Sequence, residues 1–315
     1  MAYRNILILG GTGFLGSALA EILHRQGCRV TLPTRRRSSA MALAVCPTAE
    51  LVEADVHDPA SLDQLLQGQD AAINLVGILH GGSGQPYGAG FARAHVELPA
   101  KLADACIRTG VRRLLHVSAL HADTKGPSQY LRSKGDGEAA LRTQSSHLDI
   151  TIFRPSVVFG PGDSFLNLFA DLLKTAPFVP LGGAHARFQP VYVGDVARVM
   201  IASLSRPEAI GQSYDLGGPR VYELQELVRL VGEATGRRRP VFPLPDGLAR
   251  LMAGFMELLP NPPMTRDNLD SMKLDSVCTG SPLPFGFEPT PLEAVLPSWL
   301  QGVPAYDLFR ARARR

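Results

Sequence analysis

The feature that most constrains the fold is a glycine-rich turn between an apolar run and an amphipathic helix pattern. The run NILILG (5–10) is predicted as a buried strand, and FLGSALAEILHRQG (14–27) as a helix that ends at Gly27. A strand that passes through such a turn directly into a helix is typical of a βαβ unit that binds a dinucleotide.

Three glycines with G-x-x-G-x-x-G spacing give this turn its chemistry. Gly10 permits a tight turn, Gly13 lets the backbone approach a pyrophosphate, and Gly16 lets the helix lie close to the sheet. Backbone N–H groups and the positive end of the helix then hold the phosphates. The predicted phosphate-binding segment consists of Gly10, Thr12, Gly13, Phe14, Leu15 and Gly16.

Apolar runs alternate with helical patterns through the first half of the chain. Further strands are predicted at 29–35, 49–56, 71–77, 112–119 and 149–160, and further helices at 61–68, with Ser61 as its cap, and at 91–110, where Pro99 breaks the regularity. Strands separated by helices imply right-handed crossovers and a parallel sheet covered on both faces. We therefore predict an α/β fold, a doubly wound parallel sheet of the Rossmann type.

The pattern changes after residue 160. The stretch 188–204 is predicted as a short strand and a helix that pack back on the sheet, and the chain beyond about residue 220 is Pro-rich with helical pieces. We predict a Rossmann domain of residues 1–160 to which 187–218 returns. Residues 161–186 and 219–315 then form a smaller, mixed C-terminal lobe.

Composition limits the function classes. Apolar residues make up 45% and charged residues 19% of the chain, which predicts a packed core, and a net charge of +3 is too small to indicate nucleic-acid binding. The four cysteines lie far apart without CxxC spacing, which favours reduced thiols in the cytoplasm over a zinc site or a disulfide framework. His80, His116 and His121 lack ligand spacing, so no metal site is predicted. The N-terminus lacks a signal-peptide pattern.

The ends of the next strands indicate which cofactor binds. The second strand ends in Arg35, Arg36 and Arg37 without an acidic residue, which suits a 2′-phosphate and favours NADP(H), with NAD(H) as the alternative. Asp55 and Val56 can bracket an adenine, although Asp55 also suits an ordinary turn. The fourth strand ends at Leu75, Val76 and Gly77, where the small glycine lets the chain pass near the cofactor.

The stretch SQYLRSKGDGE (128–138) places Tyr130 and Lys134 one helical turn apart on one face. Taken alone, this spacing is equally typical of an ordinary amphipathic helix. Ser118 ends the fifth strand twelve residues earlier, where it can face the same edge of the sheet as the tyrosine. The three residues together predict a polar site beside the glycine loop.

In this order and spacing, these segments resemble the short-chain dehydrogenase/reductase superfamily. FRPSVVFGPGD and QPVYVGDVA extend the resemblance into its extended, epimerase/dehydratase-like branch and add Pro155, Val157 and Val158 to the expected cofactor contacts. The stretches SQYLRSKGDGE, FRPSVVFGPGDSFLNLF and RFQPVYVGDVARVM look like the branch of nucleotide-binding accessory subunits of mitochondrial complex I and their bacterial relatives.

The resemblance implies catalytic roles for three residues. Tyr130 would be the general acid–base, Lys134 would favour the phenolate and hold the nicotinamide ribose, and Ser118 would orient a substrate carbonyl. Two departures weaken a third reading, a nucleotide-sugar epimerase. Ala119 and Leu120 stand where a sugar dehydratase has an acidic pair, and HVELP replaces the NVxGT helix motif, with His95 in the asparagine position.

Two main functions remain open at this stage. One is an NADP(H)-dependent oxidoreductase acting on a carbonyl or alcohol, with an apolar small molecule among the candidate substrates. The other is a non-catalytic NADPH-bound accessory or assembly protein of a respiratory or quinone-linked complex.

The segment DGLARLMAGFMELLPNPPM (246–264) bears on the second function because it carries apolar residues at helical spacing. This pattern suits either a helix that covers the substrate pocket or a surface helix that contacts lipid or a membrane protein. Arg250 and the basic tail RARARR would favour an anionic surface, so a peripheral position at the inner face of a membrane is the alternative to the cytoplasm.

Overall fold

The computed structural model describes residues 3–36, 46–260 and 262–300, which pack as two units. The first unit contains Met1–Pro155, Val193–Leu216 and Gly280–Phe287, and the second contains Ser156–Tyr192, Gly217–Thr279 and Glu288–Arg315. These limits differ by several residues from the expected boundaries at 160, 187 and 218. The sequence did not indicate that Gly280–Phe287 returns to the first unit.

The described part of the first unit is built on a seven-stranded sheet with the order β11-β6-β5-β4-β1-β2-β3, in which every neighbouring pair is parallel. The predicted doubly wound α/β fold is therefore confirmed. The strands are β1 (Asn5–Leu9), β2 (Arg29–Thr34), β3 (Ala49–Glu53), β4 (Ala71–Asn74), β5 (Arg113–Val117), β6 (Asp149–Pro155) and β11 (Ser213–Leu216).

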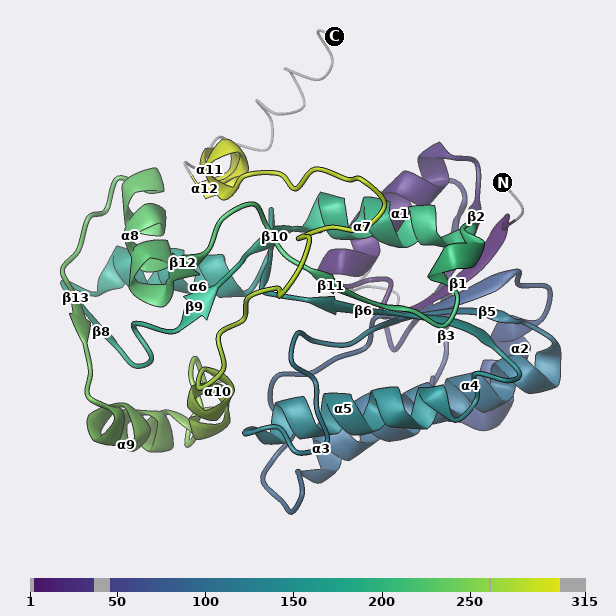
Figure 1. Cartoon of the computed structure of the whole chain (residues 1–315), viewed down its shortest axis with the longest axis horizontal. Coiled ribbons are helices and arrows are strands. Elements are labelled where there is room, and N and C mark those ends of the chain that lie inside the picture. The colour runs from purple at the N-terminus through teal and green to yellow at the C-terminus, as the bar shows by residue number, and fades with distance from the viewer. Residues whose placement is uncertain (1–2, 37–45, 261, 301–315) are drawn as a thin grey trace, which may run out of the picture. The chain divides into compact units, whose positions relative to one another are not determined.

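Helices cover both faces of this sheet (Figure 1). On one face lie α1 (Phe14–Arg25) and α7 (Val193–Leu204), which pack against each other. On the other face lie α2 (Pro59–Leu66), α4 (Leu98–Thr109) and α5 (Gln129–Arg142). The short 3₁₀ helix η3 (Pro207–Ala209) follows α7 in the chain. Apolar side chains of β1, β4, β5 and β6 meet those of α2, α4 and α5 in one buried core.

The helical segment predicted at 91–110 has an internal irregularity. It begins with α3 (Ala89–Phe91), continues as the π-helix η2 (Ala92–Glu97) and ends as α4. Pro99 lies in the first turn of α4, where its missing N–H is tolerated. The π-helix immediately before it is the irregular part, and π-turns of this kind occur often at functional sites.

Two local predictions were wrong. Asp58, not Ser61, caps α2, because the Asp58 carboxylate accepts a 3.0 Å hydrogen bond from the Ser61 N–H. The sixth strand does not run to residue 160. It ends at Pro155, and Val158–Phe159 forms a separate strand, β7, that pairs with Val191–Tyr192 (β10) in the second unit.

The second unit combines short strand pairs with helices around its own apolar core. Strand β7 pairs with β10, β9 (Arg187–Phe188) with β12 (Tyr222–Glu223), and β8 (Val179–Leu181) with β13 (Val241–Pro243). Its helices are α6 (Phe165–Thr175), α8 (Leu224–Ala234), α9 (Asp246–Met256), α10 (Arg266–Ser271), α11 (Leu292–Val295) and α12 (Pro297–Leu300). In the part of the chain that the structure describes, no helix combines the length and the apolar character needed to cross a membrane.

Candidate functional site

The glycine loop connects β1 to α1 in the way that its spacing predicts. Gly10 has φ +77°, a conformation that side chains other than glycine rarely adopt. A Cβ added to Gly16 would lie 2.5 Å from the Gly10 carbonyl oxygen, so only glycine allows α1 to pack this closely on the loop. Close packing of this kind presents the start of α1 at the edge of the sheet.

The start of α1 can receive an anion. Gly13 is the N-cap residue, and among the described residues no side chain caps the first N–H groups of the helix, while Thr12 lies in the turn and Phe14 and Leu15 begin the helix. A Cβ on Gly13 would meet only the Gly10 carbonyl oxygen, at 3.2 Å, so the outer side of this residue is open. The loop therefore fits a pyrophosphate by its backbone N–H groups and its shape.

At the end of β2, the side chains of Arg35 and Arg36 are exposed. Thr34 fixes the backbone here, because its hydroxyl donates a 3.0 Å hydrogen bond to the Arg36 carbonyl oxygen. Arg37 lies outside the described residues. At the end of β3, one carboxylate oxygen of Asp55 accepts a 2.9 Å hydrogen bond from the His57 N–H, and Val56 packs against the core. Asp55 thus serves the turn that the sequence offered as its alternative role, and its contact with adenine stays a prediction.

The chain after β4 runs between the glycine loop and the lysine of α5. A Cβ added to Gly10 would lie 3.3 Å from the carbonyl carbon of Leu75 and from the nitrogen of Val76. A Cβ added to Gly77 would lie 3.2 Å from Lys134 Nζ. The structure thereby brings the glycine loop, the end of β4 and Lys134 together.

Ser118, Tyr130 and Lys134 are held by β5 and α5. Helix α5 begins after Ser128, whose hydroxyl accepts a 3.1 Å hydrogen bond from the Leu131 N–H. Lys134 Nζ donates a 3.1 Å hydrogen bond to the carbonyl oxygen of Val117, the residue before Ser118. The Ser118 hydroxyl is buried and has no hydrogen-bond partner among the described residues.

Burial is the main cause of the shifted pKa values of Tyr130 and Lys134. It raises the pKa of Tyr130 to about 12 and lowers the pKa of Lys134 to about 8, although the negative charge of Glu138 acts in the opposite direction on the lysine. Glu138 itself is buried and paired with Arg154, whose Nε lies 2.8 Å from one of its carboxylate oxygens. This ion pair attaches α5 to β6.

Sequence reasoning missed a set of buried polar groups around Lys134. His95 Nε2 accepts a 3.0 Å hydrogen bond from the Ile78 N–H, and His95 Nδ1 lies 2.8 Å from Ser133 Oγ. Asn74 Nδ2 lies 3.2 Å from His116 Nδ1. The replacement of asparagine by His95 was the one sequence signal that could have pointed to this network.

The remaining predicted contacts are dispersed. Pro155 ends β6 in the first unit, whereas Val157 and Val158 belong to the second unit, so their contribution to a cofactor site stays a prediction. The one hydrogen bond described above for Asp55 is local, to the His57 N–H, so its place in a shared cofactor site also stays a prediction.

Comparison with known proteins places this site in a family. Residues 6–217 match the model of the NAD dependent epimerase/dehydratase family. A subunit of the rat mitochondrial NADH dehydrogenase, the alpha subcomplex subunit 9, is 33% identical over 297 residues, which are 91% of this chain and 77% of the rat protein. A ceramide reductase of Caulobacter vibrioides is 30% identical over 249 residues, 76% of this chain and 74% of that protein.

Solved structures agree on the fold. The UDP-glucuronic acid 4-epimerase of Bacillus cereus, in complex with UDP-glucuronic acid and NAD, superposes with a TM-score of 0.72 at 19% identity, covering 94% of this chain and 98% of the epimerase. The family match supports nicotinamide dinucleotide binding, and the mitochondrial relatives are consistent with association with a membrane complex. From the extent of the family match and the identity with its relatives, the chain belongs to the NAD dependent epimerase/dehydratase family.

Proposed function

We propose that the protein is an NADP(H)-dependent oxidoreductase that interconverts a carbonyl compound and its alcohol. The observation that carries the proposal is the Ser118 hydroxyl, buried next to the Lys134–Val117 hydrogen bond and without a partner in the described chain. A buried hydroxyl left unpaired costs free energy. A substrate oxygen that accepts its hydrogen bond would account for it.

The three residues divide the chemistry. Ser118 orients the carbonyl oxygen, and Tyr130 donates a proton to that oxygen in the reductive direction, because burial raises its pKa to about 12 and keeps the phenol protonated at neutral pH. Lys134 holds the nicotinamide ribose. When bound, NADP(H) exchanges a hydride with the carbonyl carbon.

Arg35 and Arg36 support NADP(H) over NAD(H), because two exposed guanidinium groups at the end of β2 suit a 2′-phosphate. Fluorescence titrations with NADPH and NADH test this choice. We expect Arg36→Glu and Arg35→Glu to weaken NADPH binding and to leave NADH binding nearly unchanged. Arg29→Glu, at the exposed opposite end of β2, is the matched control. Tighter binding of NADH by the unmodified protein would reject the assignment.

An apolar substrate is favoured by the ceramide reductase among the relatives. The first experiment is purification without added nucleotide, followed by mass spectrometry of bound ligands and by turnover assays. We expect NADPH oxidation with long-chain ketones and none with nucleotide sugars. Retained NADPH that neither exchanges nor reacts with any carbonyl compound would reject the enzyme and favour the accessory role.

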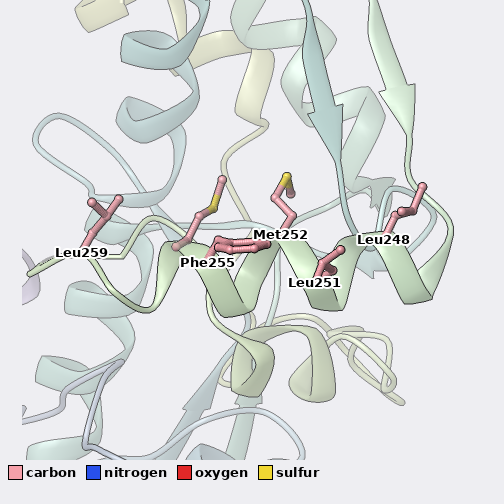
Figure 2. Close-up of a pocket in the computed structure, with 6 residues that line it drawn as sticks. Leu248, Leu251, Met252, Phe255 and Leu259 are labelled. Carbon is pink, nitrogen blue, oxygen red and sulfur yellow. The ribbon is translucent and has the colours of Figure 1, made fainter.

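The accessory role is a second candidate because of one surface in the second unit. Helix α9 buries Ala249 and Ala253, whereas its larger residues Leu248, Leu251 and Phe255 are exposed. Figure 2 shows these three larger side chains along the helix. Leu251 and Phe255 are 59% and 67% exposed. This surface, which we call the α9 face, consists of Leu248, Leu251, Met252, Phe255, Met256 and Leu259.

The charges beside the α9 face favour a protein partner over an anionic lipid surface. Arg250 pairs with Asp270, Arg266 with Glu257 at 2.6 Å, and Lys273 also with Asp270 at 2.8 Å. Its ion pair with Asp270 makes Arg250 less available to anionic lipid, so a contribution of Arg250 to an anionic surface stays a prediction, and the basic tail lies outside the described residues. An apolar surface whose neighbouring basic side chains are engaged in ion pairs suits a protein partner, and the mitochondrial relatives, subunits of an NADH dehydrogenase, support a subunit of that kind of complex as the partner.

Two substitutions on this face test the accessory role. The double variant Leu251→Asp/Phe255→Asp should lose co-migration with NADH dehydrogenase activity on native gels of detergent-solubilised membranes. Ile107→Asp/Ile210→Asp, at exposed apolar positions elsewhere, should keep it. Flotation of the purified protein with protein-free liposomes, abolished by the first variant only, would instead identify lipid as the partner.

The compartment follows from the same proposal. The four cysteines are free thiols, which supports a reducing environment. We place the protein in the cytoplasm, with peripheral contact at the inner face of the membrane when its complex is present. Fractionation of cells that express a tagged chain tests this placement, and recovery from an oxidising compartment would contradict it.

A further inference from the structure

His95 connects the chain after β4 to α5 through its two ring nitrogens. Nε2 accepts a 3.0 Å hydrogen bond from the Ile78 N–H, so this nitrogen carries no proton. Nδ1 must therefore carry it in the neutral ring, and it donates to Ser133 Oγ at 2.8 Å. Ser133 in turn donates to the Tyr130 carbonyl oxygen at 2.8 Å. The hydrogen bonds alone thus fix one tautomer of a neutral imidazole.

The backbone of the same residue also presses on α5. A Cβ added to Gly137 would lie 2.0 Å from the His95 carbonyl oxygen, so the π-helix η2 and α5 are in backbone contact at this point. Only glycine fits there. The position of His95 relative to α5 is therefore set twice, by its backbone and by its ring.

Three groups meet beside Gly77. A Cβ on this glycine would lie 3.2 Å from Lys134 Nζ and 3.8 Å from His95 Nε2. The His95 and Tyr130 rings also meet edge to face, with their centroids 5.6 Å apart. The His95 imidazole therefore lies between the chain around Gly77, which is expected to pass the cofactor, and the side chains of Tyr130 and Lys134.

We propose that His95 is a positioning residue, which holds the Val76–Ile78 segment in register with Tyr130 and Lys134 and keeps the space around the lysine free of water. This inference rests on the proposed cofactor site. It does not make His95 a proton carrier, because its acceptor nitrogen is already occupied by a backbone N–H. Burial also lowers the pKa of His95 to about 2, so the ring stays neutral.

The pKa of Lys134 provides a readout that a merely structural role would not change. Among the described residues, the titratable groups that interact electrostatically with Lys134 are Glu138 on its own helix, His95 on η2 and His116 on β5, and Tyr130 lies one turn earlier on α5. Since burial is the main cause of the lowered pKa of Lys134, water that enters in place of the imidazole should raise that pKa toward its ordinary value of 10.5. Loss of stability alone would leave it unchanged.

The experiment follows the ¹³Cε signals of the five lysines through a pH titration without cofactor. Lys134→Gln assigns the signal of Lys134, which should titrate near pH 8 in the unmodified protein. In His95→Ala the midpoint should rise by at least one pH unit. In His95→Gln, the amide oxygen can accept the hydrogen bond from the Ile78 N–H, so the midpoint of the Lys134 titration should stay close to that of the unmodified protein. His24→Gln is the matched control, since His24 also hydrogen-bonds a hydroxyl, that of Thr48.

NADPH titration completes the test. His95→Ala and Ser133→Ala should each weaken binding by about five- to tenfold, the effect of one lost buried hydrogen bond, and His95→Gln should do so less. Folded His95→Ala and Ser133→Ala proteins that both keep the original NADPH affinity, together with an unchanged Lys134 midpoint in His95→Ala, would overturn the inference. If His95→Ala does not fold, Ser133→Ala and His95→Gln decide it by affinity. If the unmodified protein does not bind NADPH, the proposed function is rejected. In that case the titration of Lys134, which needs no cofactor, still tests whether His95 is a positioning residue.

Discussion

The ammonium group of Lys134 is held 3.1 Å from the carbonyl oxygen of Val117, so the charge on α5 rests at the end of β5, one residue before Ser118. A lysine in this position is buried rather than solvated. If Lys134 holds the cofactor as proposed, its protonation should control binding at a given pH.

The affinity for NADPH should depend on pH through Lys134. Burial lowers the pKa of this lysine to about 8, so raising the pH beyond 8 removes the ammonium that the ribose needs. Affinity should then fall by up to about tenfold for each pH unit, until the pKa of the complex is reached. Fluorescence titrations with NADPH between about pH 6.5 and about pH 9.5, which bracket the pKa of Lys134, measure this dependence. In Lys134→Arg, which cannot lose its proton, the affinity should not vary with pH.

Tyr130→Phe should separate chemistry from binding. The phenyl ring keeps the packing against Phe91 and His95, so the NADPH affinity should change little. Turnover of a carbonyl substrate should fall by about 10²- to 10⁴-fold, because the proton donor is missing. Single-turnover oxidation of NADPH measures this rate. A variant as fast as the unmodified protein would exclude Tyr130 as the acid.

Ser118→Ala should lower activity without lowering stability. The Ser118 hydroxyl has no partner in the described residues, so its removal leaves no protein group unpaired. We expect the free energy of unfolding to stay the same or to rise by up to about 1 kcal/mol. Ser128→Ala is the contrasting control, because Ser128 caps α5 and its loss should cost about 1 kcal/mol. Urea denaturation of both variants compares them, and equal destabilisation would show a hidden structural role for Ser118.

Two buried histidines should make the fold sensitive to acid. Burial lowers the pKa of His95 to about 2 and that of His116 to about 3, both well below the ordinary value of 6.5. Below pH 6.5 the unfolded chain therefore binds protons that the folded chain does not, and the free energy of unfolding falls as the pH falls. Each histidine should contribute a slope of about 1.4 kcal/mol per pH unit in this range.

Variants can assign that slope to the two residues. Urea denaturation of His95→Gln and His116→Gln between about pH 6.5 and about pH 4.5 should show that the free energy of unfolding falls less steeply with falling pH. Each variant should lose the slope that one histidine contributes. His24→Gln should keep the full slope. A decline that is identical in all variants would mean that neither imidazole is held neutral in the folded state.

The sequence predicted those parts of the fold that depend on local patterns. Strand β1, the glycine loop and α1 follow one another within 21 residues, and the loop geometry at Gly10 and Gly16 requires glycine for backbone reasons that a sequence can show. The cap of α2 was also within reach of a local argument. Pro59 begins the helix, and a proline at the first helical position indicates that the residue before it, Asp58, is the cap.

The errors concern contacts between residues far apart in the sequence. Apolar residues resume at Val157 directly after Pro155 and Ser156, and pairing with β10, more than 30 residues later, shows that Val158–Phe159 is a separate strand. His95 and Ser133 are separated by 38 positions, and their contact also depends on the π-turn that rotates the histidine inward. No periodicity in the sequence indicates either contact. The candidate catalytic residues were instead found by resemblance, which carries such long-range information.

Helix α9 exposes large apolar side chains and buries small ones, and this arrangement should affect how much of the protein a cell retains. Folding gains little from Leu251 or Phe255, since more than half of each side chain is exposed while Ala249 and Ala253 are buried. A molecule made in excess of its binding partner would display a surface that chaperones recognise as misfolded, although the molecule is correctly folded. We therefore expect the cellular amount of the protein to follow the supply of whatever covers this helix, and surplus copies to be removed by proteolysis.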